Sequence, residues 1–440
     1  MADLKPVFTA RSVATLTVGA VIGSGVFLVP TAVLRSSGGS VGVATMIWIV
    51  GGVLSFLGAL SYAELSAMNP KAGGLYLYLR DAFGQAVAFA YGWTLFVVIG
   101  SGTVATLAVA STAYLAEWIP MTPGVRTVVA VVIALAVALV NVFGTGQSAR
   151  LINIGTVLKV GAIVLLIVAL PILGSGFQQV ERVWPDAMSP SLLTTAGIGL
   201  VSVLWAYEGW QYLTFIAGET IEPQRNFPRG LALGTLALIV IYVLASLAYV
   251  AGLGPAGVMG STRVAADAAR ESLGPAWGKA ITIPIIVSML TAAQSNAMMS
   301  ARVYYAMARD GVFFAPMGRI SERFGTPAVA IVAAAIWSAV LAASGTFEVL
   351  LSYVVFVGWV FYALAGLAVI ALRRKQPDLP RPFRVPGYPV TPLLFVLSGF
   401  AIVVNTVIDN PRQGAIGLGA TALALPIFFL WRRLAPPPNA

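Results

Sequence analysis

The sequence predicts an all-α membrane protein that crosses the bilayer about a dozen times. Of its 440 residues, 59% are hydrophobic and only 10% are charged, whereas soluble domains carry about 25% charged residues. The mean hydropathy of +0.90 is sustained along the whole chain, and one spanning helix needs about 20 apolar residues. These observations exclude a soluble enzyme and a single membrane anchor below a globular head.

The apolar segments divide the chain into twelve candidate spans. They lie at 12–35, 42–67, 82–117, 126–143, 151–174, 192–217, 230–253, 277–308, 328–345, 347–372, 391–409 and 413–432. Five spans counted from the first and five from the sixth give stretches of similar length that start on opposite sides of the membrane. We therefore expect a cytoplasmic N-terminus at 1–11, two inverted five-helix repeats at 12–174 and 192–372, and two additional helices at 391–432, all within one transporter domain.

The distribution of basic residues predicts the orientation of the chain. With the N-terminus inside, 18 of the 26 Lys and Arg residues fall in inner loops, seven fall in outer loops, and Lys159 stays within the membrane. Because Lys and Arg are in excess on the cytoplasmic side of membrane proteins, we expect both termini in the cytoplasm of a bacterial inner-membrane protein. Positive charge spread over all the inner loops does not indicate nucleic-acid binding.

The chain contains no Cys and no His. This excludes disulfides, thiol nucleophiles, imidazole bases and Cys/His zinc sites, and we expect neither a metal nor a cofactor. A membrane-embedded enzyme would need a cluster of acids or a nucleophile with its base, whereas only Glu208 and Lys159 lie clearly at mid-depth. We therefore expect no catalytic residues.

The first predicted span contains a glycine-rich interruption, Gly19-Ala-Val-Ile-Gly23-Ser24-Gly25. Gly19 and Gly23 have the spacing of a small-residue helix-packing face. Alternatively, the Gly-Ser-Gly run lets the helix unwind, which frees peptide N–H groups at the start of a half-helix. Such N–H groups, together with the helix dipole, bind a carboxylate without a cationic side chain.

The sixth predicted span contains a second interruption, Trp205-Ala206-Tyr207-Glu208-Gly209. Interrupted helices at matching places in two halves indicate a transporter whose site lies at the membrane midplane. Glu208 is a candidate functional residue because an acid at mid-depth is costly without a partner or a wet cavity. It could form an ion pair with Lys159, receive a substrate ammonium, or carry a proton, and the sequence leaves these alternatives open.

Lys159 also lies near mid-depth, where its side chain does not easily reach water. Its ammonium therefore needs oxygen partners or a cavity, and it could either carry a proton or remain a fixed charge. Three other charged residues, Glu64, Glu117 and Arg302, fall near span ends, where we expect solvated side chains. Polar residues of the eighth span either line the transport path or form hydrogen bonds between helices.

Four sequence signatures resemble the amino acid–polyamine–organocation (APC) superfamily, in particular its L-amino acid transporter-type branch. They are Gly19–Pro30 (GAVIGSGVFLVP), Trp205–Gln211 with Gly218–Pro228 downstream, Ser300–Gly311, and Asp378–Tyr388. They are spread over most of the chain and are specific in combination. The resemblance implies two inverted five-helix repeats plus two further helices, and transport of amino acids without Na⁺.

The resemblance also implies roles for individual residues. The predicted substrate-binding residues are Val21, Gly23, Ser24, Gly25, Trp205, Ala206 and Glu208. In the family, the glycine-rich backbone holds the substrate carboxylate, carbonyls at the positions of Val21, Trp205 and Ala206 take the amino group, and the position of Trp205 is an aromatic gate. Lys159 matches a lysine that stands where sodium-coupled relatives bind their ion, and Ser288 matches a position near it.

Glu208 departs from the animal members of this branch, which usually carry Gly at that position, while similar bacterial members often carry an acid. We expect a transporter of neutral L-amino acids that works by exchange or proton coupling, with alternating access to a midplane site. The alternative on the same fold is a cationic amino acid or polyamine exchanger that uses Glu208 for a second ammonium, and a channel or nutrient sensor is a further alternative. The expected partners are an amino acid substrate and the lipid bilayer, with no obligate protein partner.

Overall fold

The computed structural model describes residues 6–344, 347–409 and 411–434. The helices in chain order are α1 (Ala10–Val21), α2 (Gly25–Ser36), α3 (Val41–Met68), α4 (Leu75–Phe83), α5 (Gln85–Thr94), η1 (Leu95–Ile99), α6 (Gly100–Leu115), α7 (Pro123–Leu139), η2 (Val140–Phe143), α8 (Thr145–Leu173), η3 (Gly176–Gln179), α9 (Pro190–Ala206), η4 (Trp210–Glu219), α10 (Pro223–Gly260), α11 (Val264–Leu273), α12 (Pro275–Ala280), α13 (Thr282–Arg309), η5 (Ala315–Gly318), α14 (Ala328–Ser344), α15 (Phe347–Lys375), α16 (Val390–Asp409), α17 (Pro411–Ala422) and α18 (Ala424–Leu434). The described residues form no strand beyond one isolated bridge between Phe8 and Thr220. The predicted all-α class is therefore confirmed.

Helical segments occupy each predicted span. Within the described part of the chain, eight helical segments are long and apolar enough to cross a membrane, and the bent pair α1–α2 makes a ninth. Ala328–Ser344 and Val390–Asn405 are shorter apolar helices, and the last predicted span is divided between α17 and α18. Residues 1–5 of the predicted N-terminal segment and residue 345 of the ninth predicted span lie outside the described residues.

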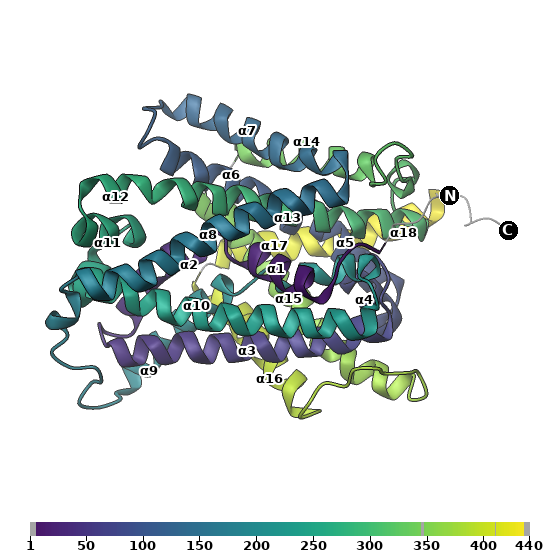
Figure 1. Cartoon of the computed structure of the whole chain (residues 1–440). Coiled ribbons are helices and arrows are strands. Elements are labelled where there is room, and N and C mark those ends of the chain that lie inside the picture. Colours follow the sequence, from purple (N-terminus) through teal and green to yellow (C-terminus); the bar gives the residue numbers. More distant parts are fainter. Residues whose placement is uncertain (1–5, 345–346, 410, 435–440) are drawn as a thin grey trace.

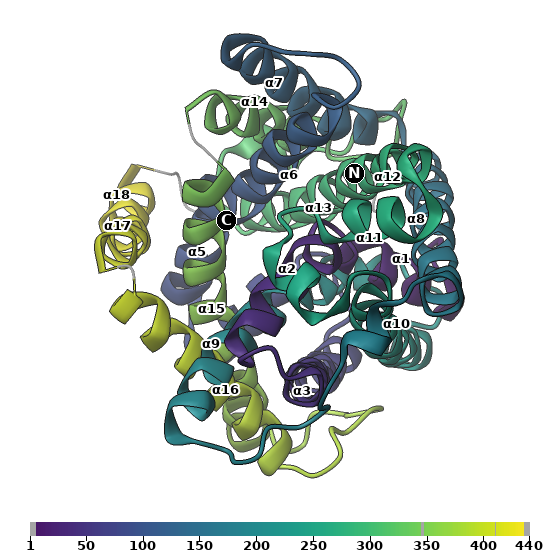
Figure 2. The same cartoon turned by 90° about the vertical axis from the view of Figure 1, so that its left-hand side faces the viewer.

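The broken first span lies in the interior of the bundle. Figure 1 shows α4 and α18 at one end of the molecule and α11 and α12 at the opposite end, which we call the α4 end and the α11 end. Viewed from the α11 end, α1 and α2 lie near the middle, whereas α7, α14, α17 and α18 lie at the edge (Figure 2). Peripheral apolar side chains such as Val128 and Val157 are 63% and 69% exposed, as expected for surfaces that face lipid.

The third span, predicted as one helix over 82–117, is interrupted by the π-helical turn η1. A π turn displaces backbone carbonyls from their usual helical partners. Two side chains from other helices bind carbonyls of this turn: Tyr304 donates its hydroxyl to the Leu95 carbonyl at 3.1 Å, and Trp337 donates its indole N–H to the Val97 carbonyl at 2.9 Å. These contacts anchor the start of α6, a helix that contributes to the central cavity.

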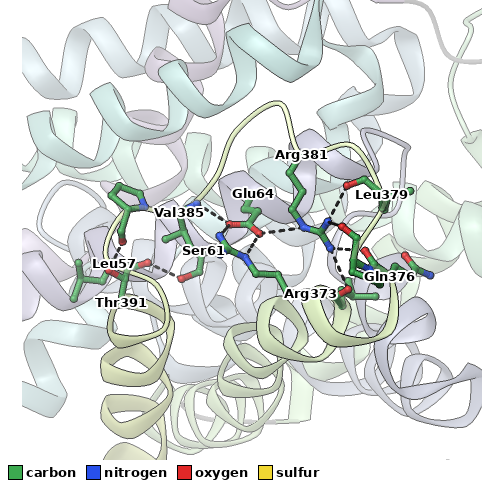
Figure 3. A network of polar contacts seen from close by, with 12 residues as sticks. Leu57, Ser61, Glu64, Arg373, Gln376, Leu379, Arg381, Val385 and Thr391 are labelled. Atoms are coloured by element: carbon green, nitrogen blue, oxygen red, sulfur yellow. Dashed lines mark hydrogen bonds and ion pairs between the residues drawn. The ribbon is translucent and has the colours of Figure 1, made fainter.

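The prediction that charges near span ends are solvated is wrong for Glu64, which is fully buried. Figure 3 shows the reason: the loop between α15 and α16 folds back over the α4 end of α3. Arg373 donates two hydrogen bonds to the two carboxylate oxygens at 2.8 and 2.7 Å, and the Val385 amide donates a third at 2.6 Å. This bidentate, charge-assisted contact joins α3 to α15 and to the following loop.

The same prediction is wrong for Arg302, whose side chain is 0% exposed. Its guanidinium donates to both oxygens of Glu219, at 2.9 and 3.3 Å, and to the Thr145 hydroxyl at 2.7 Å. The Glu219 carbonyl in turn accepts hydrogen bonds from the amides of Val7 and Phe8. One buried ion pair therefore ties the ends of η4, α8 and α13 to the segment before α1. Glu117, the third such residue, is largely buried and pairs with Arg263.

Candidate functional site

The first span breaks at residues 22–24, within the glycine-rich interruption. Helix α1 ends at Val21, α2 begins at Gly25, and the two axes differ by 56°. Gly23 and Gly25 have no side chains, which removes the steric restrictions of a Cβ where the backbone leaves the helix. The predicted unwinding of the first span is confirmed. The helix-packing interpretation also holds for Gly19, because a Cβ there would lie 2.4 Å from the Thr156 hydroxyl oxygen.

The carbonyls freed at the end of α1 are bound by side chains from three other helices. A helix C-terminus leaves its last carbonyls without helical partners. The Lys159 ammonium, on α8, donates to the Gly19 carbonyl at 2.7 Å and to the Ile22 carbonyl at 2.5 Å. The Ser288 hydroxyl, on α13, lies 2.9 Å from the carbonyl oxygens of both Ile22 and Gly23. Tyr242 on α10 donates to the Val21 carbonyl at 3.2 Å.

The N-terminus of α2 lies on the opposite side of the break. The N-cap residue Ser24 makes no side-chain hydrogen bond to the first turn. The first amides of a helix have no partner within the helix, and the helix dipole gives this end a partial positive charge. A helix terminus of this kind offers N–H donors that can bind an anion.

The sixth span breaks at residues 207–209. Helix α9 ends at Ala206, and Gly209 has a φ of +130°, a conformation that side chains rarely adopt. Gln211 bridges this break, because its Oε1 accepts from the Gly209 amide at 2.8 Å while its Nε2 donates to Glu208 at 3.3 Å. The side chain of Gln211 therefore stabilises this turn through hydrogen bonds to its backbone and to Glu208.

The backbones of the two breaks are in direct contact. A Cβ on Gly25 would lie 2.9 Å from the Ala206 Cα, and a Cβ on Gly209 would lie 3.0 Å from the Ala20 carbonyl oxygen. Glycine at 25 and 209 therefore allows an approach that a larger residue would prevent.

A cavity of about 70 Å³ lies between the two breaks. All seven residues predicted to bind substrate line it: Val21, Gly23, Ser24, Gly25, Trp205, Ala206 and Glu208. Lys159 and Ser288 are not among its lining residues, since they contact the carbonyls at the end of α1. One water molecule has a share of about 30 Å³ in the liquid, so a space of this size limits a bound solute to a small molecule.

Glu208 and Lys159 have separate partners, so the ion pair considered from the sequence does not form in this structure. Glu208 Oε1 accepts from the Tyr362 hydroxyl at 3.0 Å and from Gln211 Nε2. Tyr362, on α15, is also 3.4 Å from the hydroxyl of Tyr212. This hydrogen bond connects the carboxyl of Glu208 to α15, a helix for which the sequence predicts no site residue.

Four polar residues of the cavity are not among the predicted substrate-binding residues. Thr103 and Thr106 come from α6, Tyr212 from η4 and Asn296 from α13. Asn296 belongs to the polar residues of the eighth span, for which the sequence predicts either path lining or hydrogen bonds between helices. The others gave no signal, because single Thr and Tyr residues in apolar helices are equally compatible with packing.

Replacing Gly23 with leucine is expected to abolish uptake while membrane insertion stays normal. A Cβ at this position would lie 3.6 Å from Ala292 and 3.7 Å from Leu107, which is ordinary contact. Alanine therefore fits, but the further carbons of leucine enter the cavity, and overpacking typically costs about 1–3 kcal/mol in addition. Uptake by G23L and G23A at equal protein levels checks this. Uptake by G23L at the level of G23A would contradict the site assignment.

Two helices that break at mid-length around a shared cavity, with a helix N-terminus at its edge, define a membrane transporter of small solutes. The family model described as Amino acid permease matches residues 8–427. The chain belongs to this amino acid permease family of the APC superfamily. It is a multi-pass membrane transporter of amino acids and not an enzyme.

Three relatives illustrate the family. Large neutral amino acids transporter small subunit 2 of Mus musculus is 30% identical over 444 residues, which cover 97% of this chain and 81% of that protein. The cystine/glutamate transporter of Homo sapiens is 30% identical and covers 98% of this chain and 86% of its own length. The serine/threonine exchanger SteT of Bacillus subtilis is 28% identical, with 94% of each chain covered.

Proposed function

We propose that this chain is a Na⁺-independent transporter of small neutral L-amino acids, which works by exchange or proton coupling. The cavity between the two breaks would open alternately to the two sides of the membrane. The proposal places the chain in a bacterial inner membrane, with the α4 end and both termini in the cytoplasm, because the predicted inner loops carry most of the basic residues. It also treats the protein as a single functional chain, although the murine relative is named a small subunit.

The observation that carries Na⁺ independence is the position of the Lys159 ammonium. Backbone carbonyls at a broken helix are the groups that bind Na⁺ in transporters of this architecture. Here the carbonyls of Gly19 and Ile22 accept hydrogen bonds from a fixed ammonium. The ammonium of Lys159 would therefore neutralise these carbonyl dipoles in place of a bound Na⁺ ion.

Recognition of an amino acid would use the two sides of the first break. The uncapped N-terminus of α2 suits the substrate carboxylate, and carbonyls near Val21, Trp205 and Ala206 suit its ammonium. The cavity of about 70 Å³ favours the smallest side chains. Trp205 lines this cavity and would cover a bound solute.

One observation favours a second candidate, a cationic amino acid or polyamine exchanger: Glu208 lines the cavity. A charged carboxylate there would bind a second ammonium group. The two candidates predict opposite orders of competition between neutral and cationic solutes, so they are separable by one assay.

Both proposals are tested with purified protein in liposomes preloaded with an unlabelled mixture of L-amino acids. Uptake of a labelled mixture of L-amino acids is expected to proceed equally in Na⁺ and choline buffers. Alanine and serine are expected to compete strongly, and arginine and putrescine weakly. A requirement for Na⁺ would refute the role given to Lys159, and strong competition by arginine or putrescine would favour the second candidate.

A further inference from the structure

The carboxyl of Glu208 has an unequal environment at its two oxygens. Oε1 accepts two hydrogen bonds, from Tyr362 at 3.0 Å and from Gln211 at 3.3 Å. Oε2 is buried and has no hydrogen-bond partner among the described residues. An ionised carboxylate has acceptor sites on both oxygens, whereas a protonated carboxyl has one carbonyl-like oxygen and one hydroxyl. The pattern of partners matches the protonated form.

Among the described residues, the titratable groups that face Glu208 from the surrounding helices are phenols. They are Tyr62 of α3, Tyr91 of α5, Tyr212 of η4 and Tyr362 of α15. Each of these side chains is buried, and a phenol is neutral in its ordinary form.

Within the part of the chain that the structure describes, no cation is paired with Glu208. The ammonium of Lys159 is bound to the carbonyls of Gly19 and Ile22. Arg302, in the C-terminal half of α13, is paired with Glu219. An uncompensated buried carboxylate is very costly, so such a group takes up a proton instead.

We infer that Glu208 holds a proton in the closed pocket and that it couples amino acid movement to proton movement. The inference rests on the proposed alternating access, because the group must meet water on each side in turn. The proton comes from water on one side, forms an O–H bond with the carboxyl, and leaves to water on the other side. Tyr362 is a positioning residue, since α15 brings its hydroxyl to both Glu208 and Tyr212.

The decisive experiment compares the wild type with Glu208→Gln in liposomes, using the labelled mixture of L-amino acids. Glutamine keeps the size of the side chain and an oxygen for Tyr362, but it cannot exchange a proton. With an alkaline interior, the wild type is expected to accumulate label up to about tenfold per pH unit, the limit for one proton per solute. E208Q is expected to show no accumulation driven by the pH gradient, whatever its rate of exchange.

The controls separate the possible outcomes. Glu271→Gln, an exposed change at the α11 end, is expected to accumulate like the wild type. The inference fails if E208Q accumulates label under the pH gradient, or if the wild type exchanges label but never accumulates it. Absence of both exchange and accumulation in the wild type would instead overturn the proposed function.

A second variant decides the matter if E208Q also loses exchange. Tyr362→Phe removes one hydrogen bond from Glu208 and leaves the carboxyl in place. The inference then predicts accumulation by the wild type, and a shifted pH of half-maximal uptake in Y362F with its maximal rate within threefold. An unchanged pH profile in Y362F would contradict it.

Discussion

Replacing Lys159 with alanine is expected to lower transport more than about 100-fold while the chain remains in the membrane. The ammonium donates to the Gly19 and Ile22 carbonyls across the first break. Hydrogen bonds to charged groups contribute about 1.5–3 kcal/mol each, and two of them correspond to a factor above about 100. Alanine also leaves buried carbonyls without this donor, so the break loses its defined geometry.

Initial rates of amino acid exchange in liposomes measure this effect. Lys71→Ala is the matched control, because Lys71 is exposed in the loop before α4 and its loss is expected to leave the rate within twofold. A K159A protein that exchanges at more than half the wild-type rate would show that the ammonium does not hold the site together.

Replacing Arg302 with alanine is expected to cost about 3–5 kcal/mol of stability, because it breaks a buried ion pair and leaves Glu219 charged and unpaired. Arg302 and Glu219 are 0% and 2% exposed. The substitution also removes the donor to Thr145, so the α4 ends of η4, α8 and α13 lose their common contact.

The melting temperature of the purified protein in detergent checks this prediction. Arg319→Ala, an exposed change near η5, is expected to have little effect. The double variant R302M/E219M is expected to recover most of the loss, since an apolar pair of similar volume often replaces a buried ion pair at little cost. A melting temperature of R302A equal to that of the wild type would contradict the role of this pair.

Composition was sufficient to predict the class of the protein, and the apolar segments along the chain predicted the positions of its spans. Long apolar segments must form helices in lipid, because every backbone group needs a partner within the segment. The two breaks were also predictable, since Gly23, Gly25 and Gly209 interrupt otherwise apolar helices and Glu208 is costly at mid-depth. The division of the chain into two inverted repeats at 12–174 and 192–372 stays a prediction.

The partners of the charged residues were not predictable from the sequence. Glu64 is expected to be solvated because it lies near a span end, yet the end of α15 and the loop after it, more than 300 residues away in the chain, supply its donors. The same holds for Lys159, whose need for oxygen partners was clear but whose partners, the carbonyls of Gly19 and Ile22, depend on how α8 packs against α1. Tertiary packing, and no local pattern, determines these contacts.

The most direct test is an experimental structure of the protein with a bound amino acid, selected from a thermal-shift panel of L-amino acids. The expected density lies between residues 22–25 and 206–209, with the ligand carboxylate within hydrogen-bonding distance of the first amides of α2. Continuous helix through both segments, or a ligand bound elsewhere in the bundle, would contradict binding by peptide groups at the two breaks.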